Sequence, residues 1–276
     1  MKPVDFAYAR PRRLADAIAL LAESGERGKV MAGGQSLGPM LNMRLVQPEL
    51  IVDITALDEL KRAEKAGDHL VLGACVTHAD IEDGRVGDVT NGAMRAVASG
   101  IAYRAVRNRG TIGGSLTNAD PAADWVSALS ALGAEVVVRG AGGARTMAAE
   151  AFVTGALETS LTGGELLEAI RVPAHSAGAQ WGYYKTCRKT GEYAHAIGAV
   201  LLDRARNVFR AVIGATERKP LVLADARPWF AGKYDLATFD AGAADAALRA
   251  AGMADALDRQ IHTVALARAI RQAAGA

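Results

Sequence analysis

Two short glycine-rich segments, Ala32–Leu37 and Thr111–Ser115, constrain most strongly how this chain of 276 residues folds and what it binds. In the first segment a Gly-Gly pair follows a predicted buried strand directly and precedes a predicted helix, and the second segment offers the same arrangement. Paired glycines allow positive φ angles and let a ligand approach the main chain closely. Successive backbone N–H groups beside a helix N-terminus then form a site for an anion. The two segments therefore predict a site for a phosphate-containing ligand.

The prediction depends on where these glycine pairs lie in the sequence, because the number of such pairs is no higher than chance would give. The chain has 30 glycines and four Gly-Gly pairs, and this composition gives about three pairs by chance. The pairs at Gly142 and Gly163 lie in polar loops between predicted strands and are interpreted as turns. The sequence has no Walker-type triphosphate motif and no Rossmann glycine motif after a strand. Two separate neutral loops suit a pyrophosphate, and a pair of structural turns is the alternative.

The periodicity of apolar residues predicts two successive α+β units in the first part of the chain. The first ends near Ala56 and consists of strand, loop, helix and strand. The second contains strands separated by turns and helical stretches. Within it, Asp120-Pro121 supplies an N-cap and a first-turn proline for a helix that is expected to run through Leu132.

The last hundred residues have a different pattern and are expected to form a separate, smaller α+β domain. Three successive predicted strands suit an antiparallel meander: they cover residues 181–188, 194–202 and 208–215. After Lys219-Pro220 the pattern becomes helical, with helices expected over residues 221–225, 243–251 and 263–273.

The charge and the cysteines of the chain argue against several classes of protein. The net charge is only +2, and basic residues are scattered apart from a group at Arg104, Arg107 and Arg109, whereas a nucleic-acid binder usually has a stronger basic face. Cys75 and Cys187 are isolated, so we predict no disulfide framework, zinc site or iron–sulfur ligand set. No apolar run is long enough to span a bilayer, and no signal peptide is expected. A cytoplasmic protein is the default expectation.

The two segments, together with the stretch Asn118–Asp124 that follows the second one, closely resemble the FAD subunits of the molybdenum hydroxylases. That family includes the medium subunit of aerobic carbon monoxide dehydrogenase and the FAD domain of xanthine dehydrogenase. The resemblance extends over the whole chain. It implies an FAD-binding domain of the vanillyl-alcohol-oxidase (PCMH) type over residues 1–175, with subdomains of about 1–57 and 58–175. A smaller α+β C-terminal domain, with a three-stranded antiparallel sheet and helices, is expected over residues 176–276.

The resemblance also implies which residues hold FAD. The cofactor-binding residues would be Ala32, Gly33, Gly34, Gln35, Ser36, Leu37, Ile101, Thr111, Gly113, Gly114, Ser115, Asp124, Lys185 and Tyr193. The two glycine segments would hold the pyrophosphate. Asp124 would contact the ribose or adenine end, although an acid at a helix N-terminus is also favoured by the helix dipole.

The remaining three positions each have a structural alternative. Ile101 would line the flavin pocket, but a core residue has the same appearance in the sequence. Lys185 would lie near the flavin ring or be a solvated strand lysine. Tyr193 would cover one face of the ring or be a core tyrosine. We predict no catalytic residue and no metal ligand: His78 reads as a structural histidine at a helix start, and His195 has only its nearness to Tyr193 in its favour.

The resemblance implies an oxidoreductase subunit that carries FAD and transfers electrons. It would take electrons from a [2Fe-2S] small subunit and pass them to an external acceptor such as NAD⁺, a quinone or oxygen. A molybdopterin-binding large subunit would complete a heterohexamer, a dimer of heterotrimers. Two alternatives stay open: a stand-alone FAD-dependent oxidoreductase, and a non-catalytic nucleotide-binding subunit.

Overall fold

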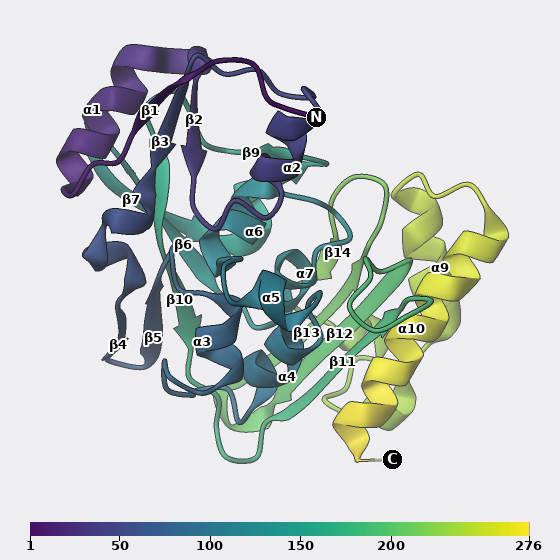
Figure 1. The fold of residues 1–276 in the computed structure, drawn as a ribbon. Coiled ribbons are helices and arrows are strands. Elements are labelled where there is room, and N and C mark those ends of the chain that lie inside the picture. Colours follow the sequence, from purple (N-terminus) through teal and green to yellow (C-terminus); the bar gives the residue numbers. More distant parts are fainter. Residues whose placement is uncertain (276) are drawn as a thin grey trace.

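The computed structural model describes residues 1–275 and contains three main sheets (Figure 1). The first sheet has the order β1-β3-β2 and is parallel throughout. Its strands and the two helices beside it are β1 (Ala7–Ala9), α1 (Leu14–Ser24), β2 (Gly28–Met31), α2 (Leu37–Asn42) and β3 (Leu50–Asp53). Helix α1 buries Ala17, Ile18 and Leu21 against this sheet, which forms one small core.

The second sheet is antiparallel and has the order β4-β5-β10-β6-β7. Its strands are β4 (Ala63–Ala66), β5 (His69–Gly73), β6 (Glu135–Gly140), β7 (Gly143–Ala148) and β10 (Leu166–Pro173). The segments between them are α3 (His78–Glu82), α4 (Ala93–Ser99), α5 (Arg104–Arg107), α6 (Ile112–Asn118), α7 (Asp124–Ala131), α8 (Ala149–Phe152) and the hairpin β8 (Val153–Gly155) and β9 (Glu158–Thr159). The largest core joins this sheet to α4, α6 and α7.

The third sheet is antiparallel, with the order β11-β12-β13-β14. It is formed by β11 (Gln180–Thr186), β12 (Ala196–Asp203), β13 (Val208–Gly214) and β14 (Leu221–Leu223), and α9 (Ala241–Ala250) and α10 (Ala256–Ala274) follow it. Helix α10 lies along one face of the sheet (Figure 1). Gly182 permits this close packing, because a Cβ atom there would lie 1.8 Å from the carbonyl oxygen of Ala269.

Helix α7 connects the second and third sheets. All eight of its residues are buried. Trp125 and Leu129 belong to the core of the second sheet, whereas Ala131 packs against Ala199 and Val212 of the third sheet. The third sheet therefore lies between α7 and α10.

Most of the predicted elements are present, but four details differ. Helix α10 begins at Ala256, seven residues before the predicted start at residue 263. The predicted helix at residues 221–225 is the strand β14, because Val222 pairs with Val212 of β13. The C-terminal sheet therefore has four strands within the described chain, not three. Helix α7 begins at Asp124, with Ala123 as N-cap, because the Asp120 side chain accepts a hydrogen bond from the Ala122 N–H in a turn. Strand β1, three residues long, was not predicted from its sequence.

Candidate functional site

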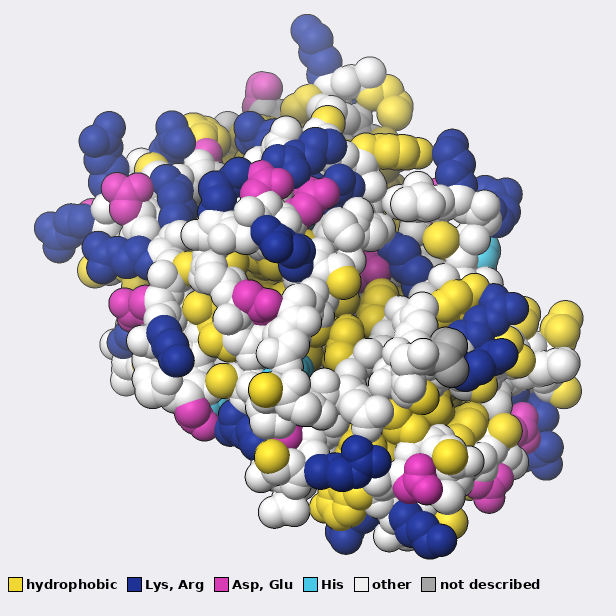
Figure 2. All heavy atoms as spheres, turned by 90° about the horizontal axis from the view of Figure 1, so that it is seen from below, with side chains coloured by type: hydrophobic (Ala, Val, Ile, Leu, Met, Phe, Trp, Pro, Cys, Tyr) yellow, Lys and Arg dark blue, Asp and Glu magenta, His cyan; other side chains and the backbone are white. Residues whose placement is uncertain are grey.

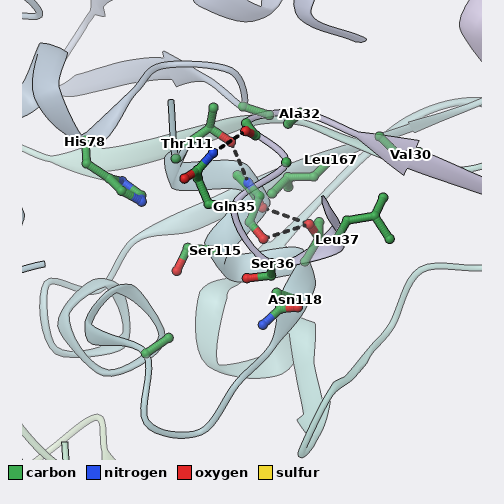
Figure 3. Close-up of a pocket in the computed structure, with 18 of the residues that line it drawn as sticks. Val30, Ala32, Gln35, Ser36, Leu37, His78, Thr111, Ser115, Asn118 and Leu167 are labelled. Carbon is green, nitrogen blue, oxygen red and sulfur yellow. Dashed lines mark hydrogen bonds between the residues drawn. The ribbon is translucent and has the colours of Figure 1, made fainter. Parts of the chain in front are cut away.

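A cavity of about 550 Å³ lies where the loop after β2 meets α6 (Figure 3). Its volume is in the range of small-molecule and cofactor sites. Both glycine segments line it, so the structure brings together parts of the chain that are almost eighty residues apart in sequence. Among the predicted site residues, Lys185 alone does not line it within the described chain. Ser36, Ser115 and Asn118 lie close together at one side of the cavity (Figure 3).

Gly33 is a glycine because of protein packing. A Cβ atom at this position would lie 2.0 Å from the carbonyl oxygen of Arg109 and 2.9 Å from the Cα atom of Gly110. Both atoms belong to the main chain just before the second segment, so a side chain at Gly33 would push the two segments apart. The sequence predicts that this glycine permits a positive φ and the close approach of a ligand, whereas in the structure Gly33 has no positive φ and its Cβ position is occupied by protein main-chain atoms.

The first segment presents a run of free backbone donors. Gly34 has a φ of +69°, the left-handed conformation that turns successive N–H groups toward one side. Within residues 1–275, the N–H groups of residues 33–37 donate no hydrogen bond to the main chain, and Ser36 provides no side-chain cap for α2. The Gln35 side chain donates to the Gly33 carbonyl at 3.0 Å and braces the loop. This run of donors is suited to an anion.

The second segment does not offer such donors. The first four N–H groups of α6 are all used inside the protein: Ile112 donates to Val76, Gly113 to Ala74, Gly114 to the Thr111 hydroxyl and Ser115 to the Thr111 carbonyl. A Cβ atom at Gly113 would lie 2.5 Å from Cβ of Ala74, so this glycine also permits close packing. The prediction of two equivalent backbone sites is therefore wrong. The first segment has N–H groups that are free to bind a ligand, whereas the second segment lines the cavity and contributes only side chains.

Thr111 acts as an N-cap of α6, since its hydroxyl accepts a hydrogen bond from the Gly114 N–H at 3.0 Å. We expect the Thr111→Val variant to lower the free energy of unfolding by about 1 kcal/mol, the usual cost of losing such a cap. Urea unfolding measures this change. Thr117→Val is the matched control, because the Thr117 hydroxyl donates to carbonyls within α6 and caps no helix terminus. An unchanged midpoint for Thr111→Val would contradict the capping role.

Asp124 forms a buried ion pair with Lys185. The carboxylate lies 3.0 Å from the Lys185 Nζ atom, with side-chain exposures of 10% and 12%. Lys185 also donates to the Gly100 carbonyl at 2.8 Å, and the Tyr183 hydroxyl donates to Asp124 at 2.8 Å. Lys185 is thus not a solvated strand lysine. Lys185 does not line the cavity itself, but its partner Asp124 does.

The surroundings of Asp124 shift the pKa of its carboxyl group. Burial raises the pKa of the carboxyl above the usual value of 3.8, and the Lys185 charge opposes that rise. Burial, followed by the charge of Asp124, raises the pKa of the Tyr183 hydroxyl well above 10.0. Tyr183 therefore remains a hydrogen-bond donor at physiological pH, and it supports the buried carboxylate from β11.

Tyr193 and Ile101 present apolar surface to the cavity. Tyr193 lines the cavity and is 61% exposed, so it is not a core tyrosine. Ile101 lines the cavity and also packs against the core of the second sheet, so its two interpretations are compatible. His195 is exposed and is not among the cavity-lining residues of the described chain.

The sequence predicts a structural histidine at position 78, and in the structure this side chain also contributes to the cavity. The side chain is buried and its Nδ1 atom accepts a hydrogen bond from Trp125, which agrees with a structural role. The same ring also lines the cavity (Figure 3). No sequence signal reveals this arrangement, because Trp125 lies 47 residues away.

The basic group at residues 104–109 is largely neutralised. Arg107 lies 2.7 Å from Glu82, and Arg104 contacts both Glu82 and Asp83. Figure 2 shows Lys and Arg side chains interspersed with Asp and Glu on the face that it presents. Among residues 1–275, no cluster of three potential metal ligands occurs, and no helix is long and apolar enough to cross a membrane.

Most of the sequence matches a protein family whose cofactor is known. Residues 4–175 match the family described as the FAD binding domain in molybdopterin dehydrogenase. The chain is 34% identical to the caffeine dehydrogenase subunit beta of Pseudomonas sp. strain CBB1, over 84% of this chain and 80% of that protein. It is 36% identical to the carbon monoxide dehydrogenase medium chain of Hydrogenophaga pseudoflava, over 81% of this chain and 78% of that one.

Solved structures agree with this relationship over the full length. Carbon monoxide dehydrogenase from Hydrogenophaga pseudoflava, in a form that lacks the Mo-pyranopterin moiety of the molybdenum cofactor, contains a chain that aligns with a TM-score of 0.89 and 32% identity. The alignment covers 100% of this chain and 99% of that chain. The predicted fold class, FAD as cofactor and the resemblance to molybdenum hydroxylase flavoproteins are confirmed. The chain belongs to the family of FAD-binding medium subunits of the molybdenum hydroxylases, which are oxidoreductases.

Proposed function

We propose that this chain holds FAD in the 550 Å³ cavity, with the pyrophosphate on the N–H groups of residues 33–37. The observation that carries the proposal is the run of consecutive amides without a main-chain acceptor in the described chain, turned by the positive φ of Gly34. A pyrophosphate is an anion of the right kind for such donors. Bound FAD supplies the redox chemistry, and the protein binds, orients and shields it.

The predicted residues take different parts in this proposal. Ala32 and residues 33–37 contact the pyrophosphate, and the Ser115 hydroxyl faces the same space. Thr111, Gly113 and Gly114 hold the second segment in place beside the first. Ile101 and Tyr193 supply apolar surface for the flavin ring. Asp124 lines the cavity, and Lys185 positions Asp124 through the buried ion pair.

We further propose that the subunit relays electrons. It would receive them from a [2Fe-2S] small subunit and deliver them to an external acceptor, while a molybdopterin-binding large subunit acts on the substrate. The support is that the relatives are subunits or medium chains of larger dehydrogenases. A dimer of heterotrimers is the assembly that we propose, in the cytoplasm, where Cys75 and Cys187 would remain free thiols.

We also propose a domain boundary near residue 175, with subdomains of about 1–57 and 58–175. The support is the family match, which spans residues 4–175, and the sheets, since β10 ends at Pro173 and β11 starts at Gln180.

The electron-transfer role is tested with the co-expressed complex. We expect the chain to co-purify with a molybdopterin subunit and a [2Fe-2S] subunit, and its FAD to become reduced in stopped-flow spectra once substrate is added. The isolated chain loaded with FAD is the control and should stay oxidised in the same substrate. Turnover by the isolated chain at the full rate would instead favour a stand-alone oxidoreductase. A colourless chain with no bound flavin would contradict the FAD proposal itself.

A further inference from the structure

His78 is held in one tautomer by Trp125. The His78 Nδ1 atom lies 3.1 Å from the indole Nε1 atom of Trp125, in a buried contact between α3 and α7. An indole nitrogen only donates hydrogen bonds, so Nδ1 must be the acceptor. In a neutral imidazole one nitrogen accepts and the other carries the proton. The His78 proton is therefore on Nε2.

The His78 ring stays neutral at physiological pH. Burial, followed by the positive charge of Arg107, lowers the pKa of His78 to about 4. The side chain is only 5% exposed. A neutral ring can act as a donor through Nε2 without bringing a positive charge into the cavity.

The Nε2–H group points into the cavity and has no protein acceptor among residues 1–275. In Figure 3 the His78 ring extends from its backbone toward the middle of the view, and Val30 and Leu37 lie on the far side. Gly110 makes room for the ring, since a Cβ atom there would lie 2.9 Å from Nε2. The Nε2 atom is not among the fully buried polar atoms that lack a partner, so it is open to the cavity, where a ligand can accept its hydrogen bond.

The end of the cavity where His78 lies suits a flat, partly apolar ring. Ile101, Ala102 and Val106 line the cavity together with His78. Arg107, whose positive charge lowers the pKa of His78, is paired with Glu82 at 2.7 Å. His78 thus adds a single neutral donor to this part of the cavity, and it lies near the amides of residues 33–37, because Gly110 packs against both Gly33 and the His78 ring.

We propose that the Nε2–H of His78 donates a hydrogen bond to a ring nitrogen or carbonyl of the flavin, and that Trp125 positions His78 for it. The inference rests on the proposed function. Reduction adds electron density to the flavin ring, and a hydrogen bond to an acceptor with more negative charge is stronger. His78 therefore binds the reduced ring better than the oxidised ring, and so raises the reduction potential of the bound FAD.

The reduction potential of the bound FAD tests this inference in the assembled complex. His78→Phe should weaken the preference for reduced over oxidised FAD about tenfold, which lowers the potential of the two-electron couple by about 30 mV. His78→Gln keeps an N–H donor near the same point and should restore most of the potential. The control is His195→Phe, the same replacement at an exposed histidine, with no expected shift.

A second measurement does not depend on whether His78→Phe folds. Nitrogen-15 NMR of the wild-type chain should identify the Nε2–H tautomer of His78 without FAD, and this signal should move when FAD is added. A proton on Nδ1, or FAD bound with an unchanged potential in His78→Phe, would overturn the inference about His78 alone. Failure of the wild-type complex to retain FAD would instead refute the proposed function.

Discussion

Replacing Gly33 by alanine is expected to lower FAD affinity by about 100-fold or more, although the change adds a single methyl group. The new Cβ atom would lie 2.0 Å from the Arg109 carbonyl oxygen. No side-chain rotation relieves a contact with main-chain atoms, so the loop must move. That movement would misplace the N–H groups of residues 33–37. Hydrogen bonds to charged groups contribute about 1.5–3 kcal/mol each, and 1.4 kcal/mol corresponds to a factor of ten in affinity.

The same substitution should also destabilise the fold, since overpacking typically costs about 1–3 kcal/mol. Titration of the apo chain with FAD, followed by flavin fluorescence, measures the affinity, and urea unfolding measures the stability. Gly142→Ala is the matched control. A Cβ atom at Gly142 meets no atom of the described chain within 4 Å, and its φ is not positive. Gly143 is a poorer control because its φ of +114° strains any side chain. Equal losses from Gly33→Ala and Gly142→Ala would refute the packing argument.

Replacing Lys185 by methionine is expected to lower the free energy of unfolding by about 3 kcal/mol at neutral pH. Removing one partner of a buried ion pair leaves the other charge without compensation, which costs about 3–5 kcal/mol. The remaining hydrogen bond from Tyr183 to Asp124 favours the lower end of this range. Lys189→Met is the matched control, because Lys189 is exposed in the loop after β11. Urea unfolding of the two variants provides the comparison.

The effect of Lys185→Met should depend on pH in a defined direction. The pKa of Asp124 in the folded wild-type chain is already raised by burial, and Lys185 opposes the rise. Without Lys185 the folded-state pKa rises further above the unfolded value. The folded state then binds more protons than the unfolded state between the two pKa values, so stability increases as the pH falls through that window. The destabilisation should be smaller at pH 5 than at pH 7.5. A loss that grows on acidification would contradict the ion-pair explanation.

Local patterns in the sequence predict much of this fold. The strand and helix on either side of Gly33 and Gly34, and the hairpin that ends at β5, follow from apolar periodicity and turn residues. A helix start at Thr77 is also predicted, and the structure shows a capping box between Thr77 and Asp80 there, with both of its hydrogen bonds present. Such features depend only on residues that are close together in the chain.

The features that were missed depend on distant partners. The reason for Gly33 is the carbonyl of Arg109, and the amides of α6 are occupied by acceptors on Ala74 and Val76. Lys185 finds Asp124 across 61 residues. Strand β14 forms only because β13 offers an unpaired edge. These partners are distant in the sequence and leave no local pattern. The position of the candidate site could therefore be predicted from the sequence, but the contacts of each residue could not.

The complete burial of α7 has a consequence for how the subunit keeps its cofactor. The helix carries Asp124 at the cavity and Trp125 behind His78, while its other side rests on β12 and β13. Gly214 of β13 lies so close that an added Cβ atom would be 1.8 Å from the Ser127 hydroxyl. The C-terminal sheet therefore supports the helix that lines the proposed FAD cavity. We expect that a substitution which separates β13 from α7 would weaken FAD binding without changing any residue that lines the cavity.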